Sequence, residues 1–144
     1  MKIKTRDFGE VDVSEKDIYH FTQPLFGFEP YTDFVILNDK EIGENIIWLQ
    51  SVQEQGICFI LMDPSGMSAA FSPVLPEGAD ALLGEGDCLC WVVAVVPEDF
   101  RNSSVNLKSP VFINTETHHA AQIMLESDYP VRFFFLKEGN DRCS

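Results

Sequence analysis

The chain has 144 residues, of which 45% are apolar and 12% are aromatic, a composition typical of one globular domain. No apolar run approaches the ~20 residues of a membrane-spanning helix, and the N-terminus lacks the apolar segment of a signal peptide. These features exclude a collagen, a coiled coil, a membrane span and a disulfide scaffold. We therefore expect a cytoplasmic protein with a single domain over residues 1–136 and a polar tail over residues 137–144.

The chain is strongly acidic, with 10 basic against 23 acidic residues and a net charge of −13. A direct nucleic-acid partner is disfavoured, because its phosphates would be repelled. No Lys or Arg occurs between Lys40 and Arg101, whereas that window contains many acids: Glu41, Glu44, Glu54, Asp63, Glu77, Asp80, Glu85, Asp87, Glu98 and Asp99. Two explanations stay open. These carboxylates keep the protein soluble, or they form a binding surface that attracts a basic partner.

Many short β-type runs separated by turn residues predict an all-β protein. Strands are predicted at residues 2–6, 11–13, 34–37, 46–52, 57–62, 69–74, 88–96, 104–114, 122–125 and 131–136. Two short helices are predicted, one after Ser14 over residues 15–17 and one over residues 78–83 that ends at Gly84. Strands at this spacing must close into a barrel or stack as a sandwich.

The run over residues 104–114 has an alternating pattern. Its odd-numbered apolar residues are expected to face the core: Val105, Leu107, Val111 and Ile113. Its even-numbered residues are expected to face outward: Asn106, Lys108, Pro110, Phe112 and Asn114. Pro110 has no N–H to donate, so we expect an edge strand or a bulge there. The outward face either meets another protein or lies under a loop, and the sequence leaves both readings open.

No catalytic arrangement is evident in the sequence. His20 is interpreted as a strand-end residue, and His118 and His119 as part of a solvated hairpin turn. Cys88 and Cys90 place two sulfurs on one face of a strand, which raises the possibility of zinc, but no second pair has ligand spacing. We therefore expect buried, reduced thiols that pack in the fold, with no metal, no cofactor and no enzyme activity.

A series of motifs runs along residues 5–132. In chain order they are TRDFGEVDV (5–13), IYHFTQPLFGFEPYTDFVIL (18–37), WLQS (48–51), F-x-x-x-DP (59–64), VVPED (95–99), SVNLKSPVFIN (104–114), Gln122 and YPVR (129–132). In this order and spacing they resemble the motifs of the flagellar assembly factor FliW family. The chain departs from the family pattern at Pro24, Phe26, Ala120 and Ala121, where we expect loops of a different shape.

The resemblance implies a small antiparallel β-barrel of about ten short strands with one or two short helices. It also implies a function without catalysis. Members of that family bind flagellin and the translational regulator CsrA, a small basic RNA-binding dimer, so that newly made flagellin competes with CsrA for the same protein. The alternative is a small-molecule-binding barrel or an enzyme of unknown substrate, which a deep apolar pocket with convergent polar groups would favour.

The same motifs supply the candidate partner-binding residues. These are Phe28, Glu29, Gln50, Asp63, Asn106, Lys108, Pro110, Phe112, Asn114 and Tyr129. Phe28, Trp48 and Phe112 are candidate anchors, although the apolar strand that contains Trp48 favours a core position for it. We expect CsrA to meet the acidic surface, and flagellin to be recognised through apolar and hydrogen-bonded contacts.

Overall fold

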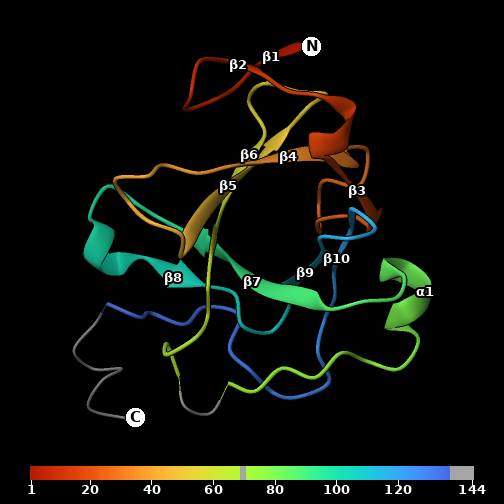
Figure 1. Ribbon diagram of the computed structural model, residues 1–144. Helices are drawn as coiled ribbons and strands as arrows, with labels where there is room; N and C mark the ends of the chain where they lie inside the picture. Colours follow the sequence, from red (N-terminus) through yellow and green to blue (C-terminus); the bar gives the residue numbers. More distant parts are fainter. Residues whose placement is uncertain (69–70, 137–144) are drawn as a thin grey trace.

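The computed structural model describes residues 1–68 and 71–136 and contains ten strands and three short helices. The strands are β1 (Lys2–Lys4), β2 (Glu10–Asp12), β3 (Ile18–Gln23), β4 (Asp33–Leu37), β5 (Ile46–Ser51), β6 (Cys58–Met62), β7 (Cys88–Val95), β8 (Ser104–Val105), β9 (Val111–Asn114) and β10 (His119–Gln122). The helices are η1 (Glu15–Asp17), α1 (Ala79–Leu83) and η2 (Phe100–Asn102). Figure 1 shows β1 and β2 as a hairpin at one end of the barrel and α1 against its side.

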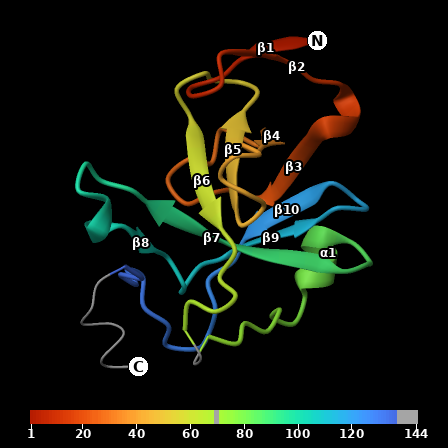
Figure 2. The ribbon, with the colours of Figure 1, turned by 60° about the vertical axis from the view of Figure 1, so that its left-hand side comes forward.

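The main sheet closes into a barrel, which confirms the predicted all-β barrel class. Its strand order is β6-β5-β4-β3-β10-β9-β7, the ring is closed by pairing of β6 with β7, and β8 pairs with the far end of β7 (Figure 2). A ring with an odd number of strands cannot alternate direction at every step. The barrel therefore contains one parallel pair, β3 with β10, in which His20 lies opposite His119. The prediction of a wholly antiparallel barrel is corrected at this pair.

Large apolar side chains fill the barrel interior. The most deeply buried are at most 1% exposed: Phe21, Phe34, Leu49, Leu61 and Ile113. Phe21 and Phe34 meet edge to face with ring centroids 5.2 Å apart. Interiors packed in this way have no voids of ligand size. Buried side chains therefore occupy the inside of the barrel.

The segment over residues 104–114, for which the sequence predicted an edge strand or a bulge at Pro110, is divided into two strands by a break in the ladder. Val105 pairs with Ala94 of β7 and Val111 pairs with Trp91, so residues 106–110 leave the ladder opposite only two residues of β7. Beyond this excursion, β9 lies between β7 and β10 inside the sheet. Its inner face enters the barrel, while its outer face is covered by α1, so all four of its residues are buried.

Other predicted elements are confirmed, moved or absent. Both predicted helices form, and the α1 helix ends at Gly84, where φ is +80°. The strand predicted at residues 122–125 lies at β10 instead, and β3 was missed because its polar and apolar residues do not alternate cleanly. Residues 71–74 are not a strand, and residues 131–136 contribute only one bridge, between Phe133 and Val105. Residues 69–70 and the predicted tail lie outside the described residues.

Candidate functional site

An apolar groove lies where several of the sequence motifs meet. It has a volume of about 280 Å³ and is lined by Leu25, Phe26, Phe28, Phe59, Val93, Val95, Ser104, Val105, Asn106, Gln122, Val131 and Arg132. These residues come from the loop before β4, from β6, β7 and β8, from the end of β10 and from the C-terminal segment. All of them except Val93 belong to the motifs that carry the family resemblance. We define this surface as the groove.

Aromatic side chains form the floor of the groove. Phe28 meets Phe59 edge to face at 4.9 Å between ring centroids, and Phe59 in turn lies 6.2 Å from Phe34 in the barrel core. A turn holds Phe28 in place, because its N–H donates to the Leu25 carbonyl at 2.9 Å. Leu25 is itself 2% exposed, so the floor rests directly on the packed interior.

Gln122 connects the two loops that border the groove. The N–H of Phe26 donates to Gln122 Oε1 at 2.8 Å, and Gln122 Nε2 donates to the Ser109 carbonyl at 3.0 Å. The side chain is buried, and both ends of its amide have a hydrogen-bond partner, as is usual for buried polar groups. This residue fixes the loop before β4 against the excursion over residues 106–110.

The excursion is held by further polar contacts. Asn106 donates its N–H to the Val93 carbonyl at 2.9 Å, and its Oδ1 accepts from the Ser109 N–H at 3.0 Å. Lys108 donates from Nζ to the Ser127 carbonyl at 2.8 Å. Leu107 inserts into the core and is 1% exposed. The candidate residues Asn106 and Lys108 thus shape the border of the groove.

The rim of the groove exposes apolar side chains. Phe26 is 43% exposed, Val95 57% and Val131 59%. Among the described residues of the lining, Arg132 alone is charged, and its guanidinium carbon lies 5.6 Å from the Phe134 ring centroid. Exposed apolar residues gathered around a groove are typical of an interaction surface.

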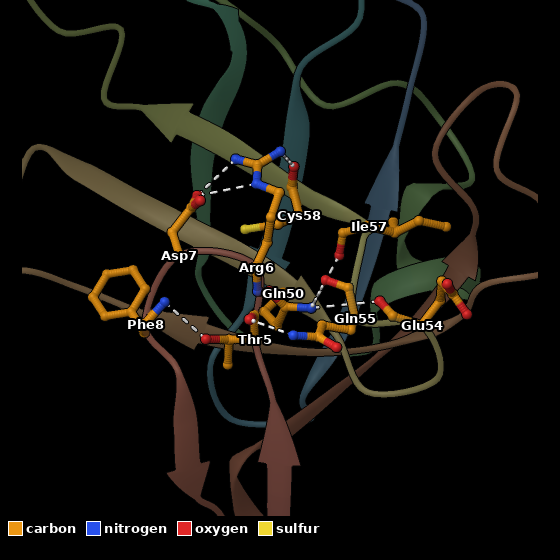
Figure 3. Close-up of polar contacts among 9 residues, drawn as sticks. All are labelled: Thr5, Arg6, Asp7, Phe8, Gln50, Glu54, Gln55, Ile57 and Cys58. Atoms are coloured by element: carbon orange, nitrogen blue, oxygen red, sulfur yellow. Dashed lines mark hydrogen bonds and ion pairs between the residues drawn. The ribbon is translucent and has the colours of Figure 1, made fainter.

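Gln50, a candidate partner-binding residue, is buried between the N-terminal segment and the turn after β5 (Figure 3). It is fully buried, its Oε1 accepts from the Arg6 N–H at 2.9 Å, and its Nε2 donates to the Ser51 and Gln55 carbonyls at 3.0 and 3.1 Å. Arg6 also donates from Nη1 to the Cys58 carbonyl at 2.8 Å. The hydrogen bond to Asp7 raises the pKa of Arg6. Gln50 therefore anchors the N-terminal hairpin, a structural role.

Three further candidates are buried, which corrects the expected outward face. Phe112 is 3% exposed and packs under α1, and Pro110 is buried with its carbonyl accepting from Ile123 N–H at 3.1 Å. Asn114 is fully buried and donates from Nδ2 to the carbonyls of Leu83 and Glu85 at 3.0 and 3.1 Å. Three even-numbered residues of this segment are therefore covered by other parts of the fold, whereas Asn106 and Lys108 are half-buried.

Of the remaining candidates, Phe28 lies on the floor of the groove, whereas Glu29, Asp63 and Tyr129 are not part of its lining. Glu29 is exposed beside it, and its Oε1 accepts from the Gly27 N–H at 3.3 Å. Asp63 directly follows β6, and its Oδ1 accepts from the Ser65 N–H at 2.9 Å. Tyr129 packs on Phe71 with ring centroids 4.8 Å apart, and its hydroxyl donates to the Ser72 carbonyl at 3.2 Å.

Several groove residues were not among the candidates: Phe26, Phe59, Val95, Gln122, Val131 and Arg132. Phe26 was noted only as a departure, and Gln122 only as part of a motif. Each of these residues belongs to one of the family-like motifs, but the motifs are separated by long stretches of chain. Only tertiary contacts bring these segments together, so spacing along the sequence could not have grouped them.

The cysteines and histidines occupy separate environments. Cys58 is buried and free, whereas Cys88 and Cys90 are free but only half-buried, which corrects the expectation of full burial. His118 stacks on Tyr19 at 4.3 Å between ring centroids instead of lying in solvent. His20, in the interior of β3, contacts Asp33 at 2.8 Å. Among the described residues, no group of three or more His, Cys, Asp or Glu side chains could hold a metal ion.

A second surface, next to α1, is acidic. Asp80 in α1, Glu85 and Asp87 in the next turn, and Glu116 are all exposed, and we define them as the acidic face. A Cβ on Gly86, where φ is +117°, would lie 2.7 Å from Glu116 Oε2, so this glycine lets the two turns approach. In the described part of the chain, no ion pair involves any of these four carboxylates.

Comparison with known proteins assigns the family. The family model described as "FliW protein" matches residues 2–135. A "Flagellar assembly factor FliW" of Caldanaerobacter subterraneus subsp. tengcongensis is 31% identical over 96% of this chain and 95% of its own length. One of Leptospira interrogans is 36% identical over 81% of this chain and 80% of its own. A solved structure, "Crystal structure of the flagellar assembly factor FliW", has a TM-score of 0.86 and 28% identity, covering 96% of this chain and 99% of that one. The chain therefore belongs to the FliW family, whose matched members are named flagellar assembly factors.

Proposed function

We propose that this protein is a cytoplasmic, non-catalytic partner-switching factor that binds flagellin and a CsrA-type translational regulator. Family membership supports the role in flagellar assembly. The described residues contain no helix long and apolar enough to cross a membrane. If the two partners exclude each other, free flagellin displaces CsrA from this protein. The released CsrA then represses flagellin synthesis, so synthesis follows the amount of free flagellin.

The observation that most favours a basic partner is the acidic face. Its carboxylates belong to a molecule with a net charge of −13, and most of them come from the window that lacks Lys and Arg. A surface of one sign raises the rate at which an oppositely charged protein associates. When bound beside CsrA, it also opposes the approach of RNA phosphates. CsrA is therefore antagonised without any chemical step.

The small-molecule alternative is disfavoured by the packing. Large side chains occupy the barrel interior, and three hollows on the described residues have volumes of about 280 to 330 Å³, close to the lower end of the ~300–1,000 Å³ typical of ligand pockets. Exposed apolar residues rim the groove, so a small ligand would remain largely in contact with water. A protein partner covers such a surface more completely.

A competition assay tests the proposal. CsrA bound to a labelled flagellin-message leader is titrated with this protein, and release of the RNA is followed by fluorescence anisotropy. We expect release, and we expect added flagellin monomer to restore RNA binding. The double variant D80K/D87K should weaken release, whereas the control E10K/D12K, with the same charge change in β2, should not. Failure of the wild-type protein to release RNA would contradict the proposal.

A further inference from the structure

The groove and the acidic face differ in the chemistry they offer, although both belong to a strongly acidic chain. Of the described residues that line the groove, none is Asp or Glu, and the one charged side chain is Arg132. A basic partner would find no carboxylate there. A partner that presents apolar side chains next to a carboxylate would find both an apolar floor and a guanidinium.

The backbone around the groove leaves little room for an added strand. Val105 exchanges hydrogen bonds with Phe133 in both directions, at 3.0 and 2.9 Å, so the outer edge of β8 is already paired. The Asn106 N–H is used by Val93, and the Gln122 amide is used by Phe26 and Ser109. An extended peptide gains most of its affinity from free edge groups, whereas a helix satisfies its own backbone and docks through side chains.

We propose that the groove is the docking site for flagellin, an inference that rests on the proposed function. Flagellin inserts the apolar face of an amphipathic helix and places a carboxylate of that helix near Arg132. Burial of the exposed apolar rim supplies the main driving force for docking, because this surface is removed from water. Contact of the helix carboxylate with Arg132 fixes its orientation. CsrA, as the basic partner, binds the acidic face. This face neighbours the groove, because α1 packs against β10 and Gln122 at the end of β10 lines the groove, so a protein seated on one face obstructs the other.

A second copy of this chain is the other conceivable occupant. Two copies each carry a net charge of −13, so their association is opposed by repulsion over the whole surface. The experiment below includes this outcome.

The test measures binding of purified flagellin monomer and of CsrA to the full chain by titration calorimetry. V131E and R132E change the rim. M124E is the matched control for V131E, since Met124 is 60% exposed and outside the groove, and R101E is the matched control for R132E. We expect V131E and R132E each to weaken flagellin binding at least about tenfold, with CsrA affinity and melting temperature unchanged. The two controls should bind flagellin as the wild type does.

The outcomes separate the two proposals. If the wild type binds flagellin and the groove variants bind it equally well, the groove assignment is wrong while the proposed function stands. If the groove variants lose flagellin and CsrA to the same extent, the groove is not specific for one partner and the inference also fails. If the wild type binds no flagellin, the proposed function itself is overturned, and the inference with it. A wild-type dimer in sedimentation that V131E dissociates would assign the groove to a second copy.

Discussion

Phe112 illustrates how a single side chain can be buried on the outside of a barrel. It packs in one cluster with Ala79, Leu83, Ala121 and Leu125, and it is 3% exposed. We expect Phe112→Ala to lower the free energy of unfolding by about 3–5 kcal/mol, because a large cavity is left under α1. Urea unfolding measures this change. Phe100→Ala is the control, since Phe100 is 63% exposed and should change stability by less than about 0.5 kcal/mol. Equal effects of the two substitutions would mean that Phe112 is not a core residue.

Two cysteine thiols, one buried and one half-buried, predict how stability depends on alkaline pH. Burial raises the pKa of Cys58 to about 11, against an opposing effect of nearby Arg6, and burial together with the Asp63 carboxylate raises the pKa of Cys90 to about 12. The unfolded thiols ionise near 9, so above that pH the unfolded state loses protons that the folded state keeps. Stability should therefore be complete below pH 9 and should fall as the pH rises toward 11.

Urea unfolding between pH 8 and pH 10.5 checks this expectation. The double variant C58A/C90A removes both groups, so its stability should fall less over this interval than that of the wild type. The comparison isolates the thiols from tyrosines and lysines that titrate in the same range. Identical slopes for the wild type and the variant would refute the expected role of the two thiols.

At the scale of elements, the groove depends on loops that Gln122 holds together. Gln122→Glu removes the donor to the Ser109 carbonyl and places a carboxylate at a buried site, so we expect a loss of about 1–3 kcal/mol in the free energy of unfolding. Flagellin binding should weaken in parallel, because the loop before β4 and the excursion no longer share a fixed geometry. Gln23→Glu, at an exposed glutamine of β3, provides the control and should behave as the wild type.

The excursion over residues 106–110 also explains why odd and even numbering did not predict which residues of the segment 104–114 are buried. Alternation predicts faces only while the ladder continues without interruption. Leu107 follows the expected parity because it enters the core from the excursion, whereas Phe112 and Asn114 are buried by α1 and its following turn. The sequence indicated a bulge or an edge at Pro110, and the structure contains a break in the ladder there. It could not indicate what covers the outer face of β9.

At the scale of the whole molecule, the net charge of −13 predicts a salt dependence. We expect the association rate with CsrA to fall as ionic strength rises from 0.1 M to 1 M, because the screening length shrinks from ~10 Å to ~3 Å. Stopped-flow fluorescence at several salt concentrations measures the rate. The rate with flagellin should change much less if docking depends on the apolar groove. A CsrA association rate that does not vary with salt would rule out electrostatic steering.

Composition, strand-length apolar runs and the order of short motifs determined the all-β class, the two predicted helices and the family, because these properties are local or depend only on order along the chain. The tertiary structure alone decided the parallel pairing of β3 with β10, since an odd ring requires it somewhere but no local pattern says where. It also decided which motif residues face outward. Gln50, Phe112 and Asn114 are buried by segments distant in sequence, while Phe28, Gln122 and Arg132 are brought to one groove. Whether a residue is buried, and which residues meet in one groove, depends on contacts between segments that are far apart in the chain. The spacing of residues along the sequence does not specify these contacts.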